Sequence, residues 1–217
     1  MSPATLPTPC NHPVGCLMGY AAGMPRDSEA TKARIFDAAV AEFAASGIAG
    51  ARVDRIAKAA RANKQLIYAY FGSKHKLFAT VLERILADLA AAAPIDGDDL
   101  PGCVDVLFAY HRAHPHVMRL LLWEALENGD RSVASEPERT AHYQDKITQV
   151  RRAQNDGVVT GDLSAPVLTL ALLSIVSWPI AVPQLPRMLL GETTDDSRQI
   201  QQELQEVARR LTQPGRG

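Results

Sequence analysis

Apolar side chains in this chain recur at intervals of three and four residues, and this spacing restricts its fold more than any other feature. Ile35, Ala39 and Phe43 lie four residues apart, so they share one face of a helix. Runs in which Val, Ile, Thr and Tyr alternate with polar residues, as they do in strands, are scarce. We therefore predict an all-α protein.

Residue types that begin or end helices divide this pattern into separate elements. Ser28 is a suitable N-cap for the first helix, and Gly47 follows that helix as a C-terminal glycine. Three prolines fall in the first turn of later helices, where a missing N–H costs little. The predicted helices span residues 28–45, 53–60, 64–71, 73–93, 98–112, 115–127, 137–156, 164–180 and 196–212.

The chain divides into three predicted parts. Residues 1–25 hold five prolines and no charged side chain, so we expect a flexible tail, with Met18 and Met24 as alternative starts to Met1. Residues 26–78 carry ten Lys and Arg against five Asp and Glu, a local charge of +5, while residues 79–217 carry −6. Positive charge confined to one short segment favours binding to phosphates.

Two short predicted helices, 53–60 and 64–71, are joined by a tight turn and resemble a helix-turn-helix. Asn63 can cap the second helix, and Ile67 and Phe71 lie four residues apart on its predicted buried side. Helical geometry then turns the side chains of three residues outward, namely Lys64, Gln65 and Tyr68. Lys can donate to guanine and Gln can pair with adenine, so this helix is suited to the major groove.

The frame I-A-x-x-A followed by L-I-Y-x-Y-F-x-S-K-x-x-L-F, from Ile56 to Phe78, resembles the TetR family of bacterial regulators. The similarity extends from about Thr31 to Leu82. It implies an all-α homodimer with an N-terminal three-helix DNA-binding unit at 26–78. It further implies a larger helical domain at 79–217 that binds a small effector and forms the dimer.

Matched residue by residue, the resemblance assigns base contacts to Lys64, Gln65 and Tyr68. It assigns phosphate contacts to Arg52, Tyr70 and Lys74. The sequence departs from the family pattern at three positions: Arg61 replaces the usual turn glycine, Gln65 a small residue, and Arg52 a threonine near the start of the second helix. The operator sequence therefore cannot be taken from a relative.

Large side chains are scarce, because aromatic residues make up only 6% of the chain. Several of them fall in the predicted effector domain and would suit an apolar or aromatic effector. For each residue singly, ordinary core packing is the alternative. The candidate pocket residues are Tyr110, His114, Met118, Trp123, Tyr143 and Trp178.

We predict no metal and no other cofactor. His111 and His114 are three residues apart and would suit two metal ligands, but Pro115 interrupts the run and no third ligand follows at a matching spacing. The uncharged N-terminal stretch with Cys10 and Cys16 is a poor metal site. There is also no GxSxG, P-loop or dinucleotide fingerprint, so we do not expect an enzyme.

The longest apolar run, 167–182, is too short and too interrupted for a membrane span, and the three cysteines fit a reducing cytoplasm. The resemblance implies a cytoplasmic repressor that a small molecule releases from a palindromic operator. It also implies that helices 164–180 and 196–212 pair with their symmetry mates. A helical protein-interaction module, or an activator without ligand-gated release, is the alternative interpretation.

Overall fold

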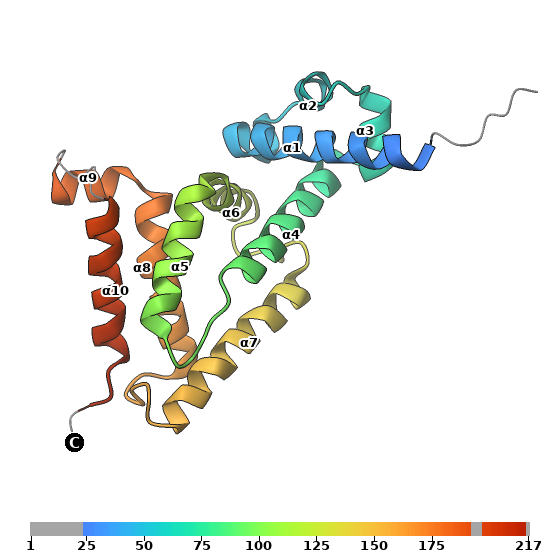
Figure 1. Cartoon of the computed structure of the whole chain (residues 1–217). Helices are drawn as coiled ribbons and strands as arrows, with labels where there is room; N and C mark the ends of the chain where they lie inside the picture. Colours follow the sequence, from blue (N-terminus) through green and yellow to red (C-terminus); the bar gives the residue numbers. More distant parts are fainter. Residues whose placement is uncertain (1–23, 192–196, 216–217) are drawn as a thin grey trace, which may run out of the picture.

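The computed structural model describes residues 24–191 and 197–215, and all regular secondary structure in these ranges is helical (Figure 1). The predicted tail, apart from Met24 and Pro25, lies outside the described residues, together with Cys10 and Cys16. The helices are α1 (Met24–Gly50), α2 (Val53–Ala59), α3 (Lys64–Phe71), α4 (Lys74–Ala92), α5 (Leu100–Ala113), α6 (Pro115–Asn128), α7 (Glu136–Asn155), α8 (Ala165–Ala181), α9 (Gln184–Leu190) and α10 (Ser197–Thr212).

Helices α1, α2 and α3 form a small headpiece at one end of the molecule (Figure 1). Its core contains the predicted apolar face of α1, and the ring of Phe43 meets that of Phe78 edge-on at 5.2 Å. The same core continues along α4 as far as Ile85, beyond residue 78. The first half of α4 therefore packs as part of the headpiece.

The second half of the molecule is a bundle in which α5 and α8 lie between α7 and α10 (Figure 1). Its core is built mainly from aliphatic side chains of α5, α7 and α8, among them Val104, Val150 and Leu168. Helix α4 runs from the headpiece into this bundle, and α6 packs against both α1 and α8. Two helices thus connect the halves.

The predicted helix bounds agree with the structure apart from two regions. Helix α1 starts at Met24, so Ser28 lies within it and is not its N-cap. The predicted break at Gly47 is present as a kink with a non-helical φ of 67°, after which the helix resumes to Gly50. The proline-rich segment after Trp178 contains the short helix α9, which the sequence reasoning missed. Pro183 and Pro186 fall at its N-cap and first turn, where a proline is tolerated and does not break a helix.

Among the residues described, no single helix is long and apolar enough to cross a membrane. Helices α8 and α9 reach that length and hydropathy only as a pair, and the pair is bent by 91°.

Candidate functional site

The second helix of the helix-turn-helix, α3, presents three of the predicted DNA-contacting side chains to solvent. The Asn63 side chain accepts a hydrogen bond from the Leu66 backbone N–H at 2.7 Å, as expected of an N-cap. Ile67 anchors the hidden face with 1% exposure, whereas Tyr68 is 43% exposed. Lys64 and Gln65 are also exposed. The predicted outward face of this helix is thus present.

Phe71 is less buried than the sequence predicted. It is half-buried and packs at the edge of the headpiece core, where its ring meets that of Tyr70 at 6.4 Å. The reason is that α3 ends at Phe71, next to Gly72. Because Phe71 occupies the last helical position, its side chain lies at the edge of the core contact that Ile67 makes.

An exposed ion pair joins the two helices of the motif. The Lys64 ammonium lies 3.0 Å from a carboxylate oxygen of Asp54 on α2. The hydrogen bond and the charge of Asp54 raise the pKa of Lys64, so this lysine carries a full positive charge at neutral pH. Because both side chains are exposed, a phosphate or a guanine can replace Asp54 as its partner at little cost.

The three predicted phosphate contacts occupy different environments. Arg52 is exposed at the N-cap of α2, and its backbone N–H donates to Glu42 Oε1 at 2.8 Å. Tyr70 is half-buried against the headpiece core, with the Lys32 ammonium 5.4 Å from its ring centre. Lys74 donates from Nζ to the carbonyls of Ala49 and Ala51, at 3.3 and 3.2 Å. Its ammonium therefore holds the end of α1 in the free protein.

The turn between α2 and α3 contains a strained residue. Arg61 has a φ of 51°, in the left-handed region that glycine adopts easily and other residues rarely do. This is the position at which the resemblance leads one to expect glycine. Arginine occupies it here, and the neighbouring Ala60 carbonyl accepts a hydrogen bond from Arg34 Nε at 3.2 Å.

A cavity of about 420 Å³ lies in the C-terminal bundle among α4, α5, α6, α7 and α8. Aliphatic side chains form most of its wall, including Leu89, Leu107 and Leu172. Its volume is in the range of small-molecule sites. Of the six predicted pocket residues, Met118 and Tyr143 line it.

The other four predicted pocket residues do not line this cavity. Tyr110 and His114 stack with ring centres 4.4 Å apart and border a shallower hollow that faces α1. Trp178 is 56% exposed on α8. Trp123 packs against α1, where its indole N–H donates to the Ala44 carbonyl at 3.3 Å. Aromatic residue type alone therefore did not identify the cavity wall.

Sequence reasoning missed the polar groups of the cavity. His111 and Lys146 are 2% and 9% exposed, and both line it. Arg139 lines it as well, and its guanidinium forms two hydrogen bonds, at 3.0 and 2.8 Å, with the buried carboxylate of Glu124. The available signal was weak. Lys146 directly precedes Ile147 and lies four residues before Val150, on the apolar side of α7.

Helix α6 connects the cavity to the headpiece. Met118 and Leu121 face the cavity, while Arg119 and Trp123 on the same helix reach α1. Arg119 Nε donates to the Ala44 carbonyl at 2.8 Å, and Trp123 donates to the same oxygen. A displacement of α6 would therefore be transmitted directly to α1.

The histidines of the α5–α6 turn do not form a metal site with other residues. Across the described ranges, no group of three or more His, Cys, Asp or Glu side chains is arranged to hold a metal ion. His111 is buried in the bundle, whereas His114 stacks on Tyr110 near the headpiece.

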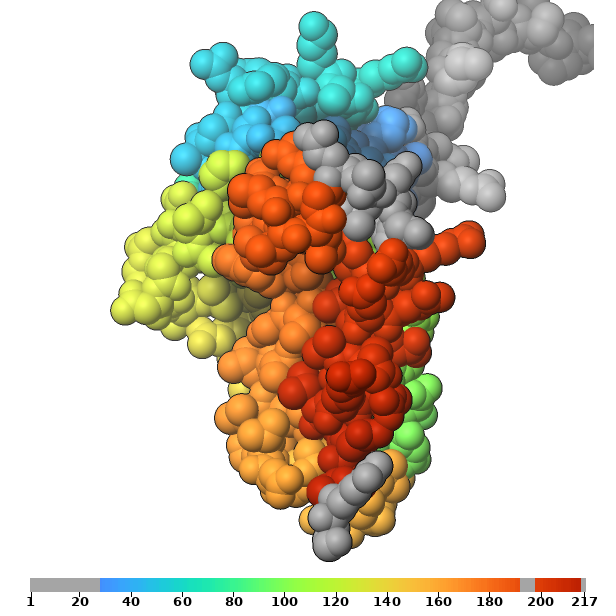
Figure 2. All heavy atoms as spheres, turned by 90° about the vertical axis from the view of Figure 1, so that its left-hand side faces the viewer, coloured from blue at the N-terminus to red at the C-terminus, as the bar shows by residue number. Residues whose placement is uncertain are grey.

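One face of the C-terminal bundle exposes a large amount of apolar surface. It combines α8 and α10 with α9 at their ends (Figure 2). The exposed large apolar residues on these helices are Val167, Leu170, Trp178, Met188, Leu189, Leu190 and Val207. Large apolar side chains exposed on neighbouring helices are typical of protein–protein contacts.

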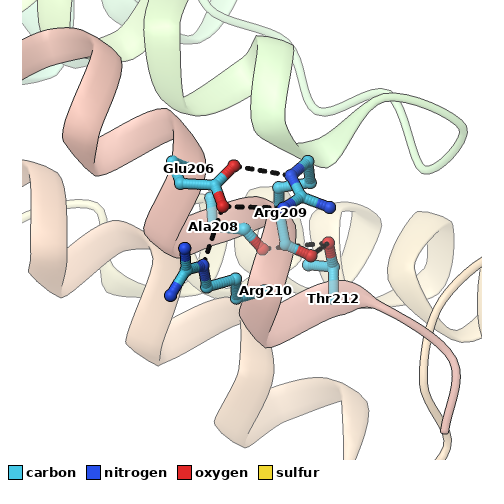
Figure 3. Close-up of polar contacts among 5 residues, drawn as sticks. All are labelled: Glu206, Ala208, Arg209, Arg210 and Thr212. Carbon is cyan, nitrogen blue, oxygen red and sulfur yellow. Dashed lines mark hydrogen bonds and ion pairs between the residues drawn. The ribbon is translucent and has the colours of Figure 1, made fainter.

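Polar groups of α10 flank this apolar face. The Glu206 carboxylate accepts hydrogen bonds from Arg209 Nε at 2.6 Å and Arg210 Nε at 2.7 Å (Figure 3). These two guanidinium groups lower the pKa of Glu206 to about 2. The end of α10 is tied to the loop before α8, because the Thr160 backbone N–H donates to the Thr212 carbonyl at 2.9 Å. The helix is thereby held beside α8.

Comparison with known proteins agrees with this geometry. Residues 35–81 match the family described as "Bacterial regulatory proteins, tetR family", and residues 99–210 match "Tetracyclin repressor-like, C-terminal domain". The chain is 50% identical over 186 residues to the HTH-type transcriptional repressor SCO4008 of Streptomyces coelicolor, covering 86% of this chain and 97% of that protein.

Two further relatives match this chain, one in sequence and one in structure. The HTH-type transcriptional repressor NicS of Pseudomonas putida is 35% identical over 111 residues, covering 48% of this chain and 52% of that protein. The crystal structure of the putative transcriptional regulator SCO4942 from Streptomyces coelicolor superposes with a TM-score of 0.75 at 33% identity, covering 84% of this chain and 98% of that one.

A helix-turn-helix headpiece with an exposed polar recognition helix, joined to an all-α domain with a cavity, defines a DNA-binding transcriptional regulator. The chain belongs to the TetR family.

Proposed function

We propose that this protein represses transcription as a homodimer on a palindromic operator and that a small molecule in the cavity releases it. The observation that carries the proposal is the exposed polar face of α3, which presents Lys64, Gln65 and Tyr68 to solvent. The helix that carries this face is capped by Asn63 and anchored by Ile67. The name of the relative SCO4008, a transcriptional repressor, supports repression as the outcome of binding. The proposed boundaries are residues 26–78 for DNA binding and 79–217 for ligand binding and dimerisation.

DNA recognition would divide between base contacts and phosphate contacts. Lys64, Gln65 and Tyr68 near the start of α3 would read base edges, each good contact contributing about 1–3 kcal/mol of discrimination. Arg52 and Tyr70 would hold phosphates on either side. Lys74 would do so by exchanging its backbone carbonyl partners for a phosphate oxygen, since these hydrogen bonds are long, at 3.3 and 3.2 Å.

The apolar face of α8 and α10 would form the dimer contact. Burying its exposed leucine, valine and tryptophan side chains against a twofold copy would produce a four-helix interface, as the sequence resemblance implies. The twofold axis would set the two α3 helices about 34–36 Å apart, matching successive major grooves.

Ligand control would pass through α4 and α6. Both helices line the cavity and both pack against α1, so a ligand that separates them changes the position of the headpiece. By linkage, operator DNA must weaken ligand binding by the same factor, typically a coupling of about 1–3 kcal/mol. If a verified cavity ligand and the operator bind independently, this part of the proposal is wrong.

The first experiment is selection of bound sequences from random duplex DNA. We expect a palindrome with half-sites one helical turn apart. On that duplex, Lys64→Ala combined with Tyr68→Ala should reduce affinity by at least tenfold, while the dimer and its thermal stability stay unchanged. Arg152→Ala is the matched charge control, because it removes one positive charge from an exposed position on α7.

The alternative, a helical protein-interaction module, predicts the opposite pattern. Such a protein would enrich no palindrome, and its weak affinity for duplexes would change equally in the α3 variant and in Arg152→Ala. An activator would enrich a palindrome but would raise transcription from it in a reporter assay.

A further inference from the structure

The cavity contains a buried cation without a counter-ion. Lys146 is 9% exposed, and its Nζ donates one long hydrogen bond, 3.4 Å, to the Ala93 carbonyl. It forms no ion pair with any carboxylate of the described residues. Burial lowers the pKa of Lys146, in keeping with an ammonium that lacks compensation. A buried charge of this kind is costly unless a partner neutralises it.

A second polar group of the cavity also lacks a partner. His111 is 2% exposed, and its Nδ1 is a buried atom without a hydrogen-bond partner. Burial lowers the pKa of His111 to about 4, so the ring is neutral at physiological pH. A neutral imidazole has one donor and one acceptor nitrogen and can therefore bond to a hydroxyl or a similar uncharged group.

Positions along α5 give an estimate of the length of the cavity wall beside these two groups. Lys146 and Cys103 both line the cavity, and each influences the pKa of the other. Cys103 and His111 are both on α5, eight residues apart, which corresponds to about 12 Å along a helix. The wall between them is apolar and includes Val104, Leu107 and Leu172.

The other charged groups that line the cavity are either paired or exposed to solvent. The Arg139 guanidinium is already paired with the buried Glu124 carboxylate. Glu83 and Glu138 line the cavity but are exposed, so water solvates their charges. Lys146 is therefore the one buried and unpaired charge among the described lining residues.

We propose that the cavity binds an amphipathic organic anion whose single acid group pairs with Lys146. An elongated apolar body lies along α5, and a polar atom at its far end bonds to His111. The inference rests on the proposed effector cavity and names the chemical class of its ligand. The ligand supplies the counter-ion that the protein does not provide.

The test compares three probes that share one alkyl chain: decanoate, 1-decanol and decyltrimethylammonium, titrated calorimetrically into the full chain. Decanoate should bind at least tenfold more tightly than either of the others, as expected for a charge-assisted hydrogen bond in a buried site. If decyltrimethylammonium binds more tightly than decanoate, the exposed glutamates dominate and the proposal is overturned.

Substitution of the lysine tests the assignment directly. Lys146→Met keeps the length of the side chain and should weaken decanoate by at least tenfold, with 1-decanol changed less than twofold. Lys146→Arg should keep the preference for decanoate, and Lys76→Met on the exposed side of α4 is the control. Equal decanoate affinity in Lys146→Met and the wild type refutes the proposal. If Lys146→Met does not fold, the probe order on the wild type decides.

A fourth probe, ω-hydroxydecanoate, tests the far end of the site. It should bind to the wild type more tightly than decanoate does. To His111→Leu, ω-hydroxydecanoate and decanoate should bind with equal affinity. The affinity of each probe for the protein and its effect on operator binding are measured in separate assays. If decanoate binds as expected but does not change affinity for the selected operator, the proposed function fails and the ligand class stands.

Discussion

Gly47 lies where α1 changes direction, and substituting it by alanine should destabilise the protein for two separable reasons. Its φ of 67° lies in the left-handed region, in which an alanine costs about 1–2 kcal/mol. A Cβ at this position would lie 2.7 Å from Cδ2 and Cε3 of the Trp123 ring. Pushing a large ring aside costs about 1–3 kcal/mol more. We therefore expect Gly47→Ala to lower the free energy of unfolding by about 2–5 kcal/mol.

The same helix offers a matched control three residues further on. A Cβ on Gly50 would meet only Ser46 Cβ, at an ordinary 3.4 Å, and the backbone of Gly50 is not left-handed. Gly50→Ala should therefore be neutral or should stabilise the protein by up to about 1 kcal/mol. Urea unfolding at one fixed protein concentration measures both variants, because the stability of a dimer depends on concentration.

A double-mutant cycle separates the two contributions. In a Trp123→Leu background the ring is absent, so Gly47→Ala should retain only the backbone cost of about 1–2 kcal/mol. An unfolding free energy for Gly47→Ala within about 0.5 kcal/mol of that for Gly50→Ala would refute the reasoning. An equal penalty with and without Trp123 would refute the contact between the ring and α1.

Two further predictions concern single residues. Arg61→Gly should raise the free energy of unfolding by about 0.5–1 kcal/mol, because the strain energy relieved at φ 51° exceeds the entropic cost of a more flexible unfolded chain. Urea unfolding measures this change. The control Lys58→Gly, within α2, should change the free energy of unfolding with the opposite sign. His111 should make stability pH-dependent: its folded-state pKa is about 4 against an ordinary 6.5, so the unfolded chain binds the proton first. Up to about 3 kcal/mol should be lost as the pH falls from 6.5 to 4, and a His111→Leu variant that loses as much over that range would contradict this assignment.

Most of the headpiece could be predicted because its determinants are local. The cap at Asn63 and the buried Ile67 depend on residues at most four positions away, so the sequence pattern contains them directly. Within that unit, the sequence did not predict that Lys74 donates hydrogen bonds to the carbonyls of Ala49 and Ala51. Those contacts join positions more than twenty residues apart.

The residues that line the bundle cavity could be predicted only in part. Met118 and Tyr143 line it as expected, but Trp123 serves the contact between α6 and α1, and Trp178 lies on the exposed face of α8. Large aromatic residues suit a pocket, a core and an interface equally well. Their type therefore carries little information about which of the three they occupy.

The spacing and caps of the sequence alone determined that this chain is helical and that residues 64–71 present a polar face with Lys64 at its start, because a helix is specified by residues three and four positions apart. The tertiary structure alone decided that Trp123 meets Ala44, 79 residues away, and that Lys146 is enclosed among α4, α5 and α7. Packing brings together residues that no local pattern connects, and the burial of a charge depends on all of them at once.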